Sequence, residues 1–187
     1  MPSSPYTDLD RPPLNERRLQ RALVEPYGPW RSLVLHAETG STNADVAQAA
    51  GAGEAEGLVV VAEQQTAGRG RLGRTWISPA RAGLATSVLL RPGRAAPDRG
   101  WPAAPPSAYG WLPLLAGVAL VAAVDRVAAV EGVLKWPNDL LVGDAKCGGI
   151  LAETVPAAAG ATSAVVLGIG LNVTLRPHEL PAGPTGL

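Results

Sequence analysis

The sequence predicts an α/β fold of the α+β type, in which a mixed, largely antiparallel sheet is flanked by helices. Strand-like segments and a helix come first, and the later strands follow one another in hairpin order. Strands and helices do not alternate strictly, so a Rossmann fold is disfavoured. With 187 residues, 47% of them hydrophobic, the chain is long enough to bury the core of one domain.

The first 30 residues are polar and rich in proline and arginine, and we expect them to form an N-terminal extension. Leu14–Val24 predicts a short helix within it. The extension is too short to hold a helix-turn-helix DNA-binding domain. The main domain is expected to span residues 31–187.

The main domain is predicted to begin with a strand and a helix. Ser32–Glu38 alternates polar and apolar residues, which is typical of a strand. Ser41 or Thr42 then caps a helix that runs to about residue 50, and Asp45 is placed to close a capping box.

The middle of the chain predicts two strands, a loop and a long helix. Leu58–Glu63 is strongly β-branched and Leu84–Leu90 is apolar, so both predict strands. Arg91–Ser107 contains five prolines and predicts a loop. Gly110–Val130 is nearly all apolar, so we expect a helix buried on most sides.

The last third of the chain predicts four further strands. They are Val133–Trp136, Leu140–Val142, Cys147–Thr154 and Ala164–Val173. Gly143-Asp144 supplies a turn between the second and third of them.

Composition excludes several classes of protein. Sixteen basic and sixteen acidic residues cancel, so a generally basic nucleic-acid surface is not indicated. The lone Cys147 excludes an internal disulfide and any multi-cysteine metal site, which leaves metal ligands unknown. The first 20 residues lack the apolar core of a signal peptide, and the longest apolar stretch, Trp111–Val124, is too short to span a membrane. We expect a cytoplasmic protein with no membrane partner.

Lysine is almost absent from the chain. Only Lys135 and Lys146 occur beside 14 arginines, and they lie 11 positions apart. A coding bias that replaces surface lysine by arginine would spare positions that need a compact ammonium on a flexible stem. The two lysines are therefore candidates for function.

An arginine-glycine segment follows the second predicted strand. Thr66–Thr75 holds three glycines and three arginines, so regular structure is not expected there. Exposed backbone N–H groups and guanidinium groups both bind anions, and Trp76 offers a flat face for a base. The alternative is a disordered basic loop or an RNA-binding segment.

The lysine motifs carry a second set of polar residues. In Lys-Trp-Pro-Asn-Asp (135–139), Asn138 can offer a donor and an acceptor to a ligand such as adenine. Asp139 can anchor a metal-bound water, a lysine or a ribose. Gly148-Gly149 beside Lys146 indicates close approach of backbone or ligand. An ordinary surface turn and an ordinary exposed lysine are the alternatives.

Taken together, these motifs resemble biotin–protein ligases, also called biotin–acetyl-CoA-carboxylase ligases. The resemblance runs from Glu38 to about Val173. It rests on Ser41-Thr42-Asn43, Gln64–Arg74 with Trp76, Lys135–Asp139, Lys146–Leu151 and Gly168–Asn172. The resemblance implies a catalytic domain like that of class II aminoacyl-tRNA synthetases and lipoate–protein ligases.

The resemblance also implies a reaction in two steps. Biotin and ATP, with Mg²⁺, give biotinyl-5′-AMP and pyrophosphate. The biotinyl group then passes to a lysine of the biotin carboxyl carrier domain of an acyl-CoA or pyruvate carboxylase.

Site residues follow by position from the resemblance. The implied catalytic residues are Lys146, Arg71 and Asp139. Those implied to bind biotin are Ser41, Thr42, Asn43, Gln65, Gly68, Arg69, Gly70, Arg71, Lys146 and Gly148. Those implied to bind the adenylate are Arg69, Arg71, Arg74, Trp76, Lys135, Asn138 and Asn172.

The resemblance is accompanied by two departures. No DNA-binding domain precedes the motifs, so a monofunctional enzyme without a DNA partner is expected. The family's C-terminal part and SH3-like domain do not follow residue 187, and we expect this chain to bind biotin but to transfer it poorly or not at all. The alternatives are a lipoate–protein ligase-like enzyme, a non-catalytic remnant that binds biotin or adenylate, and a nucleic-acid-binding protein whose affinity falls steeply with salt.

Overall fold

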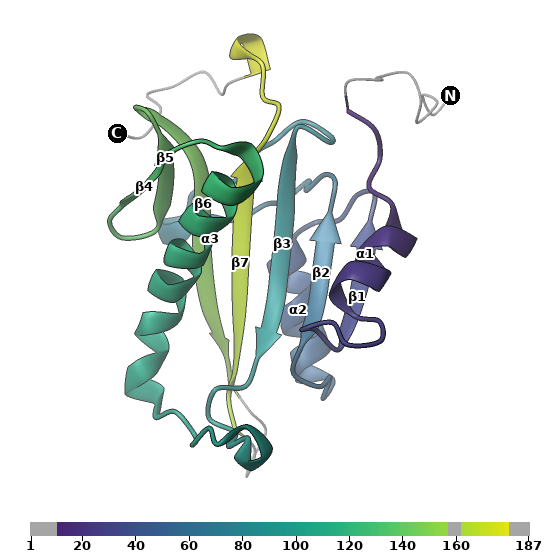
Figure 1. Ribbon diagram of the computed structural model, residues 1–187, viewed down its shortest axis with the longest axis vertical. Coiled ribbons are helices and arrows are strands. Elements are labelled where there is room, and N and C mark those ends of the chain that lie inside the picture. Colours follow the sequence, from purple (N-terminus) through teal and green to yellow (C-terminus); the bar gives the residue numbers. More distant parts are fainter. Residues whose placement is uncertain (1–10, 157–161, 180–187) are drawn as a thin grey trace.

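The fold is built on a sheet of seven strands, seen face-on in Figure 1. The computed structural model describes residues 11–156 and 162–179, so parts of the predicted N-terminal extension and of the C-terminal end lie outside the described residues. The strands are β1 (Ser32–His36), β2 (Leu58–Ala62), β3 (Gly83–Leu90), β4 (Gly132–Lys135), β5 (Asp139–Val142), β6 (Ala145–Val155) and β7 (Ala164–Asn172).

The strand order is β1-β2-β3-β7-β6-β5-β4. Only β1 and β2 pair in parallel among these neighbours, and the other five pairs are antiparallel. The prediction of a mixed, largely antiparallel sheet is therefore confirmed, and every predicted strand is present within about two residues of its expected ends.

Helices cover both faces of the sheet (Figure 1). Helix α1 (Glu16–Leu23) and helix α3 (Leu112–Ala128) lie on one face, and α2 (Thr42–Gly51) lies on the other. β2 is buried along its whole length because it is covered on both sides. Val60 packs toward α2, whereas Val59 and Val61 pack toward α1, as the two-residue period of a strand requires.

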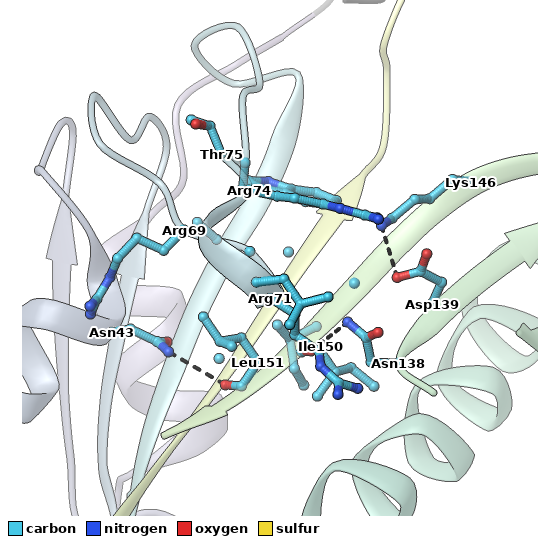
Figure 2. Close-up of a pocket in the computed structure, with 18 of the residues that line it drawn as sticks. Asn43, Arg69, Arg71, Arg74, Thr75, Asn138, Asp139, Lys146, Ile150 and Leu151 are labelled. Carbon is cyan, nitrogen blue, oxygen red and sulfur yellow. Dashed lines mark hydrogen bonds and ion pairs between the residues drawn. The ribbon is translucent and has the colours of Figure 1, made fainter. Parts of the chain in front are cut away.

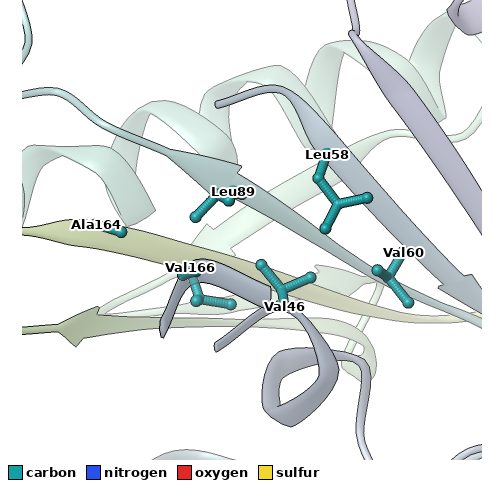
Figure 3. Close-up of a cluster of buried hydrophobic side chains, with 7 residues drawn as sticks. Val46, Leu58, Val60, Leu89, Ala164 and Val166 are labelled. Carbon is teal, nitrogen blue, oxygen red and sulfur yellow. The ribbon is translucent and has the colours of Figure 1, made fainter. Parts of the chain in front are cut away.

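The core beneath α2 fixes the position of that helix. Val46 on α2 is fully buried against Leu89 and Val166 from the central strands β3 and β7 (Figure 3). Ala50 of α2, Leu58 and Val60 of β2, and Ala164 of β7 complete this cluster. Burying such side chains stabilises the fold by about 1.5–3 kcal/mol each, so the start of α2 is held firmly over the sheet.

The prediction that the long apolar helix is buried on most sides was wrong. Ala116, Leu120 and Val124 of α3 are buried against β4, β5 and β6, but Leu115 and Val127 are 62% and 86% exposed. The sheet contacts only one side of α3, since no second layer covers the other side among the described residues. By length and composition alone, Pro106–Ala128 is apolar enough to cross a membrane, yet its buried side packs as part of this core.

The segment after β7 is tied to the N-terminal segment. Arg11 is 6% exposed, and its guanidinium donates to both carboxylate oxygens of Glu179, at 2.9 and 2.6 Å. Its Nε donates to Thr174 Oγ1 at 3.0 Å. The hydrogen bond from Arg11, followed by that from the Arg176 backbone N–H, lowers the pKa of Glu179 from 4.5 to about 2.

Candidate active site

Small residues form the floor of the site, on the face of the sheet that carries α2. Strand pairing places Ala85, Gly170 and Gly149 in one row across β3, β7 and β6, and the row continues through Asp139 of β5 to Lys135 of β4. The next row holds Ser87, Gly168 and Leu151. Gly168 and Gly170 share a face because side chains alternate along a strand. The floor is thus open to side chains and ligands from above.

A cavity of about 360 Å³ lies over this floor, and Figure 2 shows the side chains that surround it. Its walls come from the start of α2, the arginine-glycine segment, the turn between β4 and β5, and the first residues of β6. Among the described residues that line it, five are basic and Asp139 is the one carboxylate. The basic residues are Arg69, Arg71, Arg74, Lys135 and Lys146. This charge balance favours an anionic ligand.

The arginine-glycine segment folds as a small hairpin beside the cavity. The Gly70 N–H donates to the Arg74 carbonyl at 2.7 Å, and the Trp76 N–H donates to the Gly68 carbonyl at 2.9 Å. Its tip contains one turn of 3₁₀ helix, Arg71–Gly73, and Leu72 there is 89% exposed with a positive φ of 56°. The prediction of an irregular segment is confirmed apart from this single turn.

The first turn of α2 meets Gln65 at one end of the cavity. Gln65 Oε1 accepts from the Thr42 N–H at 2.9 Å and from the Thr42 hydroxyl at 3.1 Å. Ser41 occupies the N-cap position without a side-chain capping bond. The predicted capping box with Asp45 was wrong, since its carboxylate accepts from the Thr39 hydroxyl at 2.7 Å. A residue distant in sequence therefore satisfies the helix N-terminus.

Buried Ser87 links the two residues that open α2. Its hydroxyl lies 2.7 Å from Thr42 Oγ1 and 2.6 Å from Asn43 Oδ1, and it is fully buried. One hydroxyl hydrogen serves one of these acceptors at a time. Asn43 is also held from below, because a Cβ at Gly168 would lie 2.0 Å from Asn43 Oδ1. These contacts fix the side chains at the start of α2.

Lys146 lies at the opposite end of the cavity. Its Nζ is 2.8 Å from Asp139 Oδ1 and 5.9 Å from the centre of the Trp76 ring. Trp76 lies on the glycine floor, since a Cβ at Gly170 would be 2.5 Å from the Trp76 ring. The ammonium group therefore stands between a carboxylate and an aromatic face at the edge of the cavity.

Residues 41–172 match the model of the Biotin/lipoate A/B protein ligase family, which is more than half of the chain. The chain belongs to this family.

Named relatives agree with this family. A biotin–[acetyl-CoA-carboxylase] ligase of Mycobacterium tuberculosis is 46% identical over 97% of this chain. The bifunctional ligase/repressor BirA of Escherichia coli is 37% identical over 66% of this chain. A solved structure of the biotin protein ligase from Aquifex aeolicus, in complex with biotin and ATP, matches with a TM-score of 0.62 and 30% identity over 82% of this chain.

The relatives are longer than this chain. It spans 65% of the mycobacterial ligase, 35% of the Escherichia coli protein and 56% of the Aquifex aeolicus chain. The family and the fold of the matched part are established by these matches.

The structure brings most of the sequence-predicted site residues of this family member to one cavity. The lining includes Ser41, Thr42, Asn43, Gln65, Arg69, Gly70, Arg71, Arg74, Trp76, Lys135, Asn138, Asp139 and Lys146. Gly68, Gly148 and Asn172 do not line it. Gly148 is packed between β5 and β7, and its neighbour Gly149 faces the cavity instead, because a shift of one residue along a strand reverses the face.

The side chains of the two predicted adenylate-binding asparagines donate hydrogen bonds to backbone carbonyl groups in this structure. Asn138 Nδ2 donates to the Ile150 carbonyl at 2.9 Å and so ties the Lys-Trp-Pro-Asn-Asp turn to β6. Asn172 Nδ2 donates to the Lys146 carbonyl at 3.4 Å, while its Oδ1 is buried with no partner among the described residues. Cys147 donates to the Asn172 carbonyl at 3.4 Å, and burial raises the pKa of its thiol.

Sequence reasoning missed Ser87 and Glu153. In the sequence, Ser87 is a polar residue within an otherwise largely apolar strand, and nothing near it indicates that it contacts Asn43. Glu153 stands near the end of a strand, where a charged residue usually faces solvent. A weak signal existed, since Glu153 shares its strand face with Gly149 and Leu151, which both line the cavity.

Proposed function

We propose that this chain activates biotin with ATP to form biotinyl-5′-AMP and transfers the biotinyl group to a lysine of a biotin carboxyl carrier domain. We assign the activity to residues 31–187. The observation that carries the proposal is the placement of Lys146 at the edge of a cation-lined cavity, over a floor of glycines. The ligand-bound Aquifex aeolicus relative supports the choice of ligands.

In this proposal the biotin head group binds near the start of α2. Ser41, Thr42 and Gln65 offer hydroxyl, amide and backbone groups there, and the network through Ser87 holds them in place. A neutral ureido ring needs such fixed donors and acceptors rather than charge. Gly68 lets the arginine-glycine segment pack closely at its base, because a Cβ there would lie 2.4 Å from the Trp76 carbonyl oxygen and 2.9 Å from Gln65 Nε2.

The nucleotide is proposed to lie toward the β4–β5 turn. Trp76 would stack on adenine, Asn138 and Asn172 would border it, and Lys135 and Arg74 would face the phosphates. Trp76, Asn138, Lys135 and Arg74 all line the cavity, which supports this arrangement, whereas Asn172 lies outside the lining and would have to move to reach the base.

The chemistry of the first step is a phosphoryl substitution. A biotin carboxylate oxygen attacks the α-phosphorus, the bond from that phosphorus to the bridging oxygen breaks, and pyrophosphate leaves. Negative charge grows on the phosphoryl oxygens during the step. Lys146 and Arg71 would stabilise this charge more strongly in the transition state than in the ground state. Lys146 must leave Asp139 to do so, and its flexible stem allows that movement.

In the second step, the amine of a carrier lysine attacks the acyl carbonyl and AMP leaves. We propose the carrier domain of an acyl-CoA or pyruvate carboxylase as the acceptor, and the name of the mycobacterial relative supports the acyl-CoA class. The cytoplasm is the proposed compartment, because the lone Cys147 requires no oxidising environment.

Magnesium is expected to accompany ATP. No group of three or more His, Cys, Asp or Glu side chains gathers among the described residues, so a metal cage built from protein alone is absent there. Mg²⁺ is commonly held by one or two carboxylates together with substrate phosphates. Asp139, the carboxylate that lines the cavity, fits that role. The ion would neutralise phosphate charge.

The test measures pyrophosphate release by the purified chain with ATP and either biotin or lipoate. Release that requires biotin, followed by labelling of an isolated carrier domain, supports the proposal. Release with lipoate and ATP, but not with biotin and ATP, would identify the chain as a lipoate ligase of this family. Biotin binding in a calorimetric titration without any pyrophosphate release would identify a non-catalytic binding protein.

A further inference from the structure

Glu153 of β6 joins the arginine-glycine segment to the first turn of α2. Its Oε1 lies 3.2 Å from Arg69 Nη1, and its Oε2 accepts from Asn43 Nδ2 at 2.7 Å. Glu153 and Leu151 also form the sheet side of a second hollow of about 720 Å³, whose other side is residues 67–75. The ion pair therefore bridges from the sheet to that segment.

The Glu153 carboxylate is held in one orientation by buried neighbours. Asn43 is 5% exposed, and its Oδ1 lies 2.6 Å from the Ser87 hydroxyl, which donates to it. This contact directs the amide nitrogen of Asn43 toward Glu153. The absence of a side chain at Gly168 leaves the room that Asn43 occupies. One oxygen of Glu153 is thus fixed from beneath and the other faces Arg69.

Arg69 is turned away from the catalytic end of the cavity. In Figure 2 its side chain extends toward Asn43 and away from Lys146. The Arg69 and Glu153 side chains are 45% and 32% exposed, so the pair is partly solvated and weak. A phosphate or carboxylate that accepts two hydrogen bonds from a guanidinium competes well with such a pair.

We propose that Glu153 is a positioning residue that holds the arginine-glycine segment against the sheet until an anionic ligand takes Arg69. The identity of that ligand, an acyl-adenylate, rests on the function proposed above. Because Asn43 binds Glu153 and also lines the cavity, the same carboxylate connects the head-group end of the site with the segment that closes over the ligand.

The test is limited trypsin digestion at the arginines of residues 69–74, with the variant Glu153→Gln. Glutamine keeps an oxygen that accepts from Asn43 but loses the charge that holds Arg69. Without ligand, the variant should be cut about two- to fivefold faster than the wild type, the range expected for loss of a partly exposed ion pair. The ratio of the two rates should approach one as salt is raised. Equal rates at low salt would overturn the proposal.

The matched control is Glu25→Gln, which removes the same charge from an exposed position after α1. It should be cut at the wild-type rate, and an acceleration equal to that of Glu153→Gln would show that the effect is not specific to Arg69. Thermal unfolding of both variants checks that the fold is retained.

Repeating the digestion with biotin and ATP distinguishes failure of this inference from failure of the proposed function. With biotin and ATP, wild type and Glu153→Gln should be protected to the same final rate, because Arg69 has then left Glu153. A difference that persists in the ligand-bound proteins contradicts release of Arg69. Failure of biotin and ATP to protect either protein counts against the proposed function, while the ligand-free comparison still decides the role of Glu153.

Discussion

Lys146 Nζ lies 2.8 Å from Asp139 Oδ1, and Asp139 of β5 pairs with Gly149 of the neighbouring strand β6. The Asp139 side chain is 14% exposed and that of Lys146 is 33% exposed. The pair therefore holds the ammonium at the edge of the cavity, where an incoming phosphate would meet it.

Lys146→Ala is expected to slow biotinyl-AMP formation on the order of 100- to 1,000-fold, or about 3–4 kcal/mol of barrier, because one fixed charge stabiliser is removed. Lys146→Arg should restore little, since a planar guanidinium does not reproduce a compact ammonium. Pyrophosphate release is the measurement, and Arg126→Ala on the exposed face of α3 is the control. Near wild-type release by Lys146→Ala would remove Lys146 from the mechanism.

Arg71→Gln is expected to weaken retention of biotinyl-AMP. Arg71 lines the cavity from the tip of the arginine-glycine segment, where it can contact the phosphate without anchoring the fold. A leaked acyl-adenylate would biotinylate lysines of bystander proteins. The measurement is labelling of added albumin beside the rate of adenylate release. No rise in either quantity would mean that this segment does not enclose the intermediate.

Gly170→Ala is expected to displace Trp76 from the floor of the cavity. The new Cβ would lie 2.5 Å from the indole, and such overpacking costs about 1–3 kcal/mol. Biotin-dependent pyrophosphate release should fall about 10-fold or more if the indole stacks on adenine, with a rise in the KM for ATP. Gly110→Ala is the matched control, since no heavy atom lies within 4 Å of a Cβ there. Equal kinetics for the two variants would refute the role of Trp76.

Glu179→Gln is expected to lower the free energy of unfolding at pH values where Glu179 is ionised in the wild type, and to have little effect near pH 2. The pKa of Glu179 in the folded chain is lowered from 4.5 to about 2 by the Arg11 hydrogen bond and then that from Arg176. The stabilisation is therefore present above about pH 4.5 and is lost as pH falls toward 2. The measurement is the free energy of unfolding of wild type minus variant from pH 2 to pH 6. A constant difference across that range would contradict the assignment, and Glu25→Gln serves as the control.

The strands and helices along the chain were largely predictable from local pattern, whereas the candidate site residues followed from the family resemblance. Apolar runs such as Leu58–Glu63 and glycine turns such as Gly143-Asp144 indicate strands and hairpins by themselves. Motifs with unusual chemistry, including the two lysines, indicate a ligand because their residue types suit anions. The resemblance to biotin–protein ligases was confirmed at the level of the family by the match over residues 41–172.

Tertiary structure alone decided which face each residue occupies and which distant groups meet. Gly149 rather than Gly148 faces the cavity because of strand register, and α3 stays half exposed because one layer of sheet contacts it. Gln65, not Asp45, caps the start of α2. The contact of Glu153 with both Asn43 and Arg69 joins positions 110 and 84 residues apart. Local sequence determines backbone preferences, but contacts between residues that are distant in sequence depend on which strands pair in the sheet and in what register.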